Sequence, residues 1–94
     1  MRKTEIKRID FSKCRYANEI HAEIKNALNF PEHYGENLDA LWDCLWEYCG
    51  CPVLIEIYGF NSAVQEIHEE LKGIIRIFDR GAELLKGFKY KIMS

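Results

Sequence analysis

PVLIEIY, at residues 52–58, is the stretch that decides the fold. It is mostly apolar, rich in β-branched side chains and preceded by the turn residue Gly50. A short run of this composition, bounded by turn residues, predicts a strand that is buried on both faces or nearly so. We therefore expect residues 52–58 to lie at the centre of a sheet.

Two further strands are predicted near the ends of the chain. Residues 4–10 alternate between polar and apolar side chains, and residues 88–92, FKYKI, alternate strictly. Strict alternation is typical of a strand with one buried and one exposed face. The last strand should therefore expose a basic face that carries Lys89 and Lys91.

Four helices are predicted between these strands. Apolar spacing indicates the first over about residues 18–28 and the second over residues 38–48, with Asn37 as its N-cap. A third, capped by residues 61–62, would end near Gly73, and a fourth would follow it. The order β-α-α-β-α-α-β predicts an α/β fold, a three-stranded parallel sheet packed with about four helices. We expect one domain over residues 1–94.

Charge is segregated along the chain. The net charge is −2, but residues 26–71 contain no Lys or Arg and nine acids, whereas the flanks hold the other six acids and all thirteen bases. This asymmetry suggests a partner of opposite charge for the middle segment. Nucleic acid is disfavoured there because its phosphates would be repelled.

The cellular compartment is predicted from what the sequence contains near its start. The first residues are charged and lack the apolar core of a signal peptide, and no run approaches the roughly 18 apolar residues of a membrane span. We therefore expect a cytoplasmic protein. In that compartment the cysteines should be reduced thiols, not disulfides. They are Cys14, Cys44, Cys49 and Cys51.

The predicted helix over residues 38–48 has two distinct faces. At 100° per residue, one stripe faces the core and holds Leu38, Leu41, Leu45 and Tyr48. The opposite side is purely acidic and holds Glu36, Asp39, Asp43 and Glu47. A solvated polar face would explain the pattern, but such faces usually mix both signs. Trp42 and Trp46 flank the carboxylates, and aromatic residues beside charges are typical of an interface centre.

Residues 30–45, FPEHYGENLDALWDCL, resemble the signature of the barstar family of ribonuclease inhibitors. In that family a turn of the form Pro-Glu-x-Tyr-Gly-Glu-Asn precedes Leu-Asp-Ala-Leu-Trp-Asp-Cys-Leu, and residues 51–56 also resemble its second strand. The resemblance implies a barstar-like fold and a monomer that forms a 1:1 complex with a secreted, barnase-like ribonuclease. It implies no catalysis, no cofactor, no metal, and no direct contact with nucleic acid or membrane.

The resemblance also implies which residues contact the nuclease. Asp43 corresponds to the family's key acid, whose carboxylate stands in for the scissile phosphate, and Asp39 would meet another base. Asn37 would cap the helix, and Gly35 would let the loop approach the enzyme closely. The full set is His33, Tyr34, Gly35, Asn37, Leu38, Asp39, Trp42, Asp43 and Trp46.

This chain departs from the family pattern at several places. His33 stands where the family usually has Tyr, and if it is protonated it would repel a cationic cleft. Trp46 and Glu47 replace smaller residues, which suggests a partner with a differently shaped and more positive rim. A further contacting acid of the family falls at either Asp79 or Arg80, and is not assigned.

Parts of the sequence are also compatible with other functions. His33, Glu36, Asp39 and Asp43 could form an acid-base or metal site, but they would project from a convex helix instead of lining a pocket. The cysteines lack the paired spacing of structural zinc sites. His21 and His68 are interpreted as ordinary surface or boundary residues. The serious alternative is a barstar-like module that neutralises or regulates a different basic protein or toxin.

Overall fold

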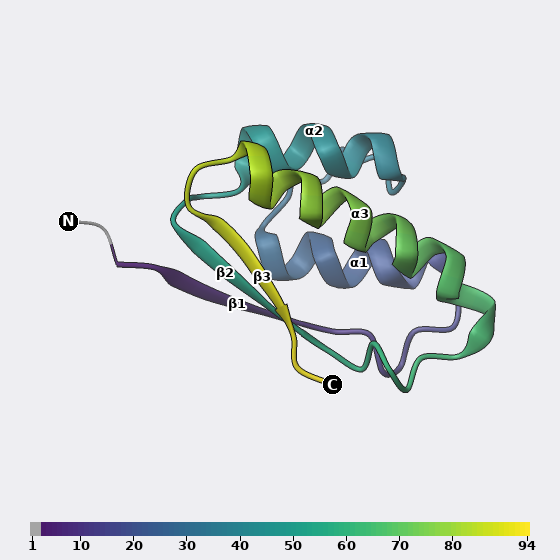
Figure 1. Cartoon of the computed structure of the whole chain (residues 1–94). Coiled ribbons are helices and arrows are strands. Elements are labelled where there is room, and N and C mark those ends of the chain that lie inside the picture. The colour runs from purple at the N-terminus through teal and green to yellow at the C-terminus, as the bar shows by residue number, and fades with distance from the viewer. Residues whose placement is uncertain (1–2) are drawn as a thin grey trace.

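Three parallel strands and three α-helices make up the described part of the chain, residues 3–94; Met1 and Arg2 lie outside it. Figure 1 shows this computed structural model. The elements follow in the order β1 (Glu5–Asp10), α1 (Ala17–Leu28), α2 (Leu38–Tyr48), β2 (Val53–Tyr58), a 3₁₀ turn η1 (Gln65–Ile67), α3 (His68–Leu84) and β3 (Phe88–Ile92). The α/β class and the three parallel strands are therefore as predicted.

Strand β2 lies at the centre of the sheet, in the order β1-β2-β3. Ile57 pairs with Ile9 of β1 on one side and with Ile92 of β3 on the other, both in parallel register. Both crossovers step in the same direction across the sheet, and right-handed crossovers of this kind place their helices on the same face. In Figure 1 all three helices lie on one side of the strands.

Because the helices cover only one face of the sheet, the prediction for β2 is corrected. Its residues alternate between fully buried, on the helix side, and half-buried, on the other. On the open face, the Glu56 carboxylate accepts hydrogen bonds from Arg8 Nε (3.0 Å) and from the Tyr58 hydroxyl (3.2 Å). The expectation of burial on both faces was wrong, because an apolar run alone does not reveal how many helical layers cover a sheet.

The predicted break at Gly73 does not exist, and α3 runs through it as one helix. A Cβ at Gly73 would lie 2.6 Å from Cδ1 of Leu38 on α2. The missing side chain therefore allows α2 and α3 to pack closely. Instead of four helices the described residues form three, preceded in the last crossover by the η1 turn.

The ends of β1 and β2 meet at a close backbone approach. Gly59 has φ +76°, and a Cβ there would lie 2.3 Å from the backbone nitrogen of Ser12. The Phe11 N–H donates to the carbonyl of Tyr58 (2.8 Å) beside it. Glycine is required here both by its backbone angle and by the space available.

Candidate functional site

The carboxylates of helix α2 face solvent, and a side-chain cap holds the N-terminus of the helix. The Asn37 side chain accepts a hydrogen bond from the Ala40 N–H (2.8 Å), which confirms it as the N-cap. Leu41 and Leu45 are buried in the core, as the predicted stripe requires. On the outer side the exposed acids are Asp39, Asp43 and Glu47.

These acids have no basic partner within residues 3–94. The ion pairs of the described chain involve other carboxylates, namely Glu5, Glu32, Glu56 and Glu69, and the Glu70 carboxylate bonds to His21. Asp39 and Asp43 are four residues apart, so two like charges lie side by side on the helix surface. The fold thus maintains a negative surface at a small cost to its own helix.

Aromatic residues border this surface. The rings of Trp42 and Trp46 meet edge to face with centroids 5.5 Å apart, and Trp46 is 50% exposed. Tyr48 was predicted to face the core, but it is 37% exposed and its ring meets that of His33 at 6.4 Å. The core stripe of α2 therefore ends at Leu45, and Tyr48 joins the aromatic border.

The loop before α2 carries exposed residues on both sides of a buried one. His33, Gly35 and Glu36 are exposed, whereas Tyr34 is 6% exposed and packs against Phe30 with ring centroids 5.2 Å apart. The Tyr34 side chain was implied to contact the partner. Its ring packs in the core, so a contact between this side chain and the partner stays a prediction.

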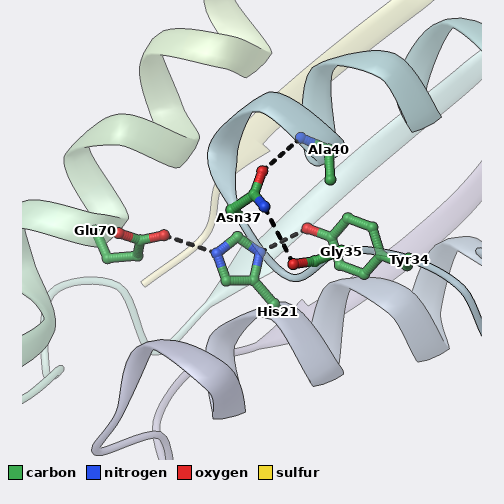
Figure 2. Close-up of polar contacts among 6 residues, drawn as sticks. All are labelled: His21, Tyr34, Gly35, Asn37, Ala40 and Glu70. Atoms are coloured by element: carbon green, nitrogen blue, oxygen red, sulfur yellow. Dashed lines mark hydrogen bonds and ion pairs between the residues drawn. The ribbon is translucent and has the colours of Figure 1, made fainter.

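His21 is the principal functional candidate that the sequence reasoning missed. It was interpreted as a surface or boundary residue, but its exposure is 0%. Figure 2 shows its ring between Tyr34, whose hydroxyl lies 2.5 Å from Nδ1, and Glu70 of α3, whose Oε2 lies 2.7 Å from Nε2. The helical periodicity contained a signal, because His21, Ile24 and Leu28 follow the i, i+3, i+7 spacing of a buried stripe. His68, by contrast, is exposed as expected.

An open groove of about 800 Å³ lies between α2 and α3 and reaches the acidic surface at Asp39. Leu38, Trp42 and Ile77 give it an apolar lining, and Arg76 and Arg80 stand on its α3 side. Asp79 is engaged by a hydrogen bond from the Tyr90 hydroxyl. Neither Arg76 nor Arg80 forms an ion pair within residues 3–94, so a partner at the groove meets bases as well as the acid Asp39.

Three further features of residues 3–94 concern metal ligands, thiols and membrane crossing. Within residues 3–94 no three His, Cys, Asp or Glu side chains are grouped so that they could hold a metal ion. Cys14 and Cys44 are buried and Cys49 is half-buried, each as a free thiol. No helix in this range combines the length and apolar character that a membrane crossing requires.

The buried thiols make the stability of the protein sensitive to alkaline pH. Burial raises the pKa of Cys14 and of Cys49 from 9.0 to about 11. The folded chain therefore holds protons that the unfolded chain releases, and the free energy of unfolding should fall as pH rises from about 9 to about 11. Urea unfolding under reducing conditions across this range would measure the loss.

The control for this prediction is a variant without the two thiols. Replacing Cys14 and Cys49 with alanine should make the decline between pH 9 and 11 shallower, although it lowers stability at neutral pH by removing buried groups. Some decline should remain, because burial also raises the pKa of Cys44 and Cys51. The partly buried hydroxyl of Tyr90, whose pKa is raised from 10.0 to about 12, adds to the decline from about pH 10 and extends it above this window. A wild-type stability that stays constant over the window would contradict the prediction.

Comparison with known proteins places the chain in one family. The sequence profile of the family described as barstar, barnase inhibitor, matches residues 4–93. The chain is also 34% identical over 91 residues to the Bacillus subtilis (strain 168) protein named "Putative ribonuclease inhibitor YrdF", an alignment that covers 82% of this chain and 97% of that protein. The match to the family profile extends over nearly all of the described residues, from β1 to β3. The chain therefore belongs to the barstar family.

Proposed function

We propose that this protein inhibits a secreted, barnase-like ribonuclease by covering its cationic active site with the acidic surface of α2. The observation that carries the proposal is a row of outward carboxylates, on a capped helix, with no basic partner within residues 3–94. The family and the named relative support inhibition of a ribonuclease. The geometry of α2 supports the mode of binding.

The proposed mechanism is mimicry of the substrate's charge. A ribonuclease that cleaves a phosphodiester presents basic side chains to an anion, and a carboxylate at Asp43 would satisfy them in place of the phosphate. Asp39, one turn earlier, would meet a second base. The α2 helix is fixed at its start by Asn37, so these carboxylates need little ordering when they bind.

The surroundings of the acids would exclude water from the ion pairs. Trp42 and Trp46 form an edge-to-face pair beside Asp43, and His33 and Gly35 lie exposed in the loop. Large rigid side chains around desolvated charges are typical of interface hot spots. We assign partner contacts to these residues and to Leu38, which borders the groove.

We further propose that the protein acts in the cytosol, as a monomer that binds one molecule of enzyme. An inhibitor held inside the cell would neutralise the nuclease before export, when cellular RNA is exposed to it. A helix that fills a single active-site cleft fits a 1:1 complex.

The test is to titrate the purified protein against barnase while the cleavage of a fluorogenic RNA substrate is followed. Activity should fall linearly and vanish at one equivalent of inhibitor. A ribonuclease of unrelated fold, assayed at the same concentrations, should keep its activity. This control separates active-site binding from sequestration of the RNA.

Absence of inhibition at micromolar excess would remove the barnase-like assignment but not the membership of the family. The same titration with a nuclease encoded beside this protein would then decide between another ribonuclease and a different basic target. We expect the choice of target to depend on three surface residues, because they alter the shape and charge at the rim of the contact surface. They are Trp46, Glu47 and Arg80.

A further inference from the structure

When the His21 ring is neutral, the direction of its two hydrogen bonds follows from the carboxylate at one end. A carboxylate such as that of Glu70 only accepts, so the neighbouring Nε2 of His21 carries a hydrogen. In the neutral ring Nδ1 then accepts, and the Tyr34 hydroxyl donates to it. The chain Tyr34 to His21 to Glu70 is satisfied throughout, and no buried side-chain nitrogen or oxygen within residues 3–94 is left without a partner.

This network lies behind the proposed contact surface, not in it. His21 belongs to α1 and Glu70 to α3, and neither helix carries the acidic row. Tyr34, however, stands between His33 and Gly35, both of which are exposed. Because consecutive Cα atoms are a fixed distance apart, holding Tyr34 restricts where these two neighbours can lie.

The loop needs such an anchor because part of its backbone is strained. Glu36 has φ 53°, in the left-handed region that costs a residue other than glycine free energy. Beyond it, Asn37 donates from Nδ2 to the Gly35 carbonyl (3.2 Å) and caps α2 through Oδ1. Figure 2 shows the His21 network and the cap side by side on this loop.

We infer that His21 is a positioning residue for inhibition. Supported by Glu70, it holds residues 30–37 through the Tyr34 hydroxyl in the conformation that binds the ribonuclease. The inference rests on the proposed function and deepens it, because it assigns a role to buried residues that never touch the partner.

A positioning role predicts a particular kinetic signature. A loosened loop leaves Asp43 and its contacts unchanged but lowers the fraction of molecules that are ready to bind. The apparent Kd rises in inverse proportion to that fraction, and the change lies in the association rate. Loss of a direct charged contact acts mainly on the dissociation rate instead.

The test compares three substitutions by stopped-flow binding to barnase under conditions where every variant is fully folded. Tyr34→Phe removes only the hydroxyl and should raise Kd about three- to tenfold, the equivalent of one net hydrogen bond, mainly through slower association. His21→Leu should do the same or more. His21→Gln should largely restore binding, since its amide offers a donor to Glu70 and an acceptor to Tyr34.

The matched control is Ile57→Val in β2, a fully buried position outside the loop and α2. It should cost a comparable amount of stability, so it lowers Tm like Tyr34→Phe but leaves the association rate unchanged. A Tyr34→Phe variant that lowers Tm yet binds barnase at the wild-type rate would overturn the inference.

A second measurement needs no partner. Three amides of this region are protected by hydrogen bonds: those of Tyr34 (to the Pro31 carbonyl), Ala40 (to Asn37 Oδ1) and Leu41 (to the Asn37 carbonyl). Their hydrogen exchange in the free protein should accelerate about tenfold in Tyr34→Phe, while the amides of Ile55 and Ile57 keep their wild-type rates. If wild-type protein fails to bind barnase, the proposed partner is wrong, but unchanged exchange in the loop would still refute the positioning role. Faster exchange confined to the loop would support it.

Discussion

Replacing Asp43 with alanine should weaken binding to barnase by about 2–5 kcal/mol, roughly thirty- to several-thousandfold in Kd. The loss follows from the basic side chains of the enzyme, which would remain desolvated in the complex without their anion. Most of the change should appear as faster dissociation. Competition for RNA cleavage at equilibrium would measure it.

The same substitution should leave the fold as stable as before, or slightly more so. Asp43 is exposed, and its removal relieves the repulsion by Asp39 while introducing a better helix former. Glu23→Ala on α1 is the matched control, because it removes one exposed negative charge on another helix. It should change Kd by less than about twofold, through long-range electrostatics alone. An Asp43→Ala variant that binds as tightly as Glu23→Ala would refute the proposed surface.

Replacing Gly59 with alanine should destabilise the protein by about 2–5 kcal/mol, a large part of the total for a domain of this size. Two costs combine: the left-handed backbone at φ +76° and a Cβ only 2.3 Å from the nitrogen of Ser12. The obstacle is backbone, which cannot rotate away as a side chain can. Thermal and urea unfolding would measure the loss.

Gly50→Ala provides the control for this prediction. A Cβ at Gly50 would have no heavy atom within 4 Å, and its φ lies outside the left-handed range. Stability should therefore change by less than about 1 kcal/mol. If the two variants had similar melting temperatures, the close approach between β1 and β2 would not be the constraint described here.

Much of the architecture could be predicted from local sequence patterns. The apolar run at residues 52–58 identified the central strand, and alternation identified β3 with its exposed Lys89 and Lys91. Asn37 fixed the start of α2, because a cap acts through hydrogen bonds to residues only three positions away. Each of these patterns reflects interactions between residues that are close together in the sequence.

The errors in the predicted fold arose at residues whose structural role depends on contacts with a distant part of the chain. Gly73 was taken as the end of a helix, but its missing side chain makes room for Leu38 on another helix. The second face of β2 is open because both crossovers place their helices on the same side, a property of the whole topology. Neither fact is encoded in the neighbouring residues.

The exposed residues of the candidate site were predicted from the sequence, but the buried residues that support them were not. The acidic row on α2 followed from helical periodicity, and Asp39 and Asp43 are exposed as expected. His21 was overlooked because a polar residue was assumed to prefer the surface. Its burial depends on Tyr34 and Glu70, which are 13 and 49 residues away and satisfy both ring nitrogens.

The bare face of the sheet has a practical consequence for anyone who builds a sensor from this protein. Lys89 and Lys91 project there, whereas α2 lies in the helical layer on the other side. A biotin tether at Lys91 would orient the molecule on a chip with its acidic helix toward the solution. Every immobilised copy would then be open to an incoming enzyme.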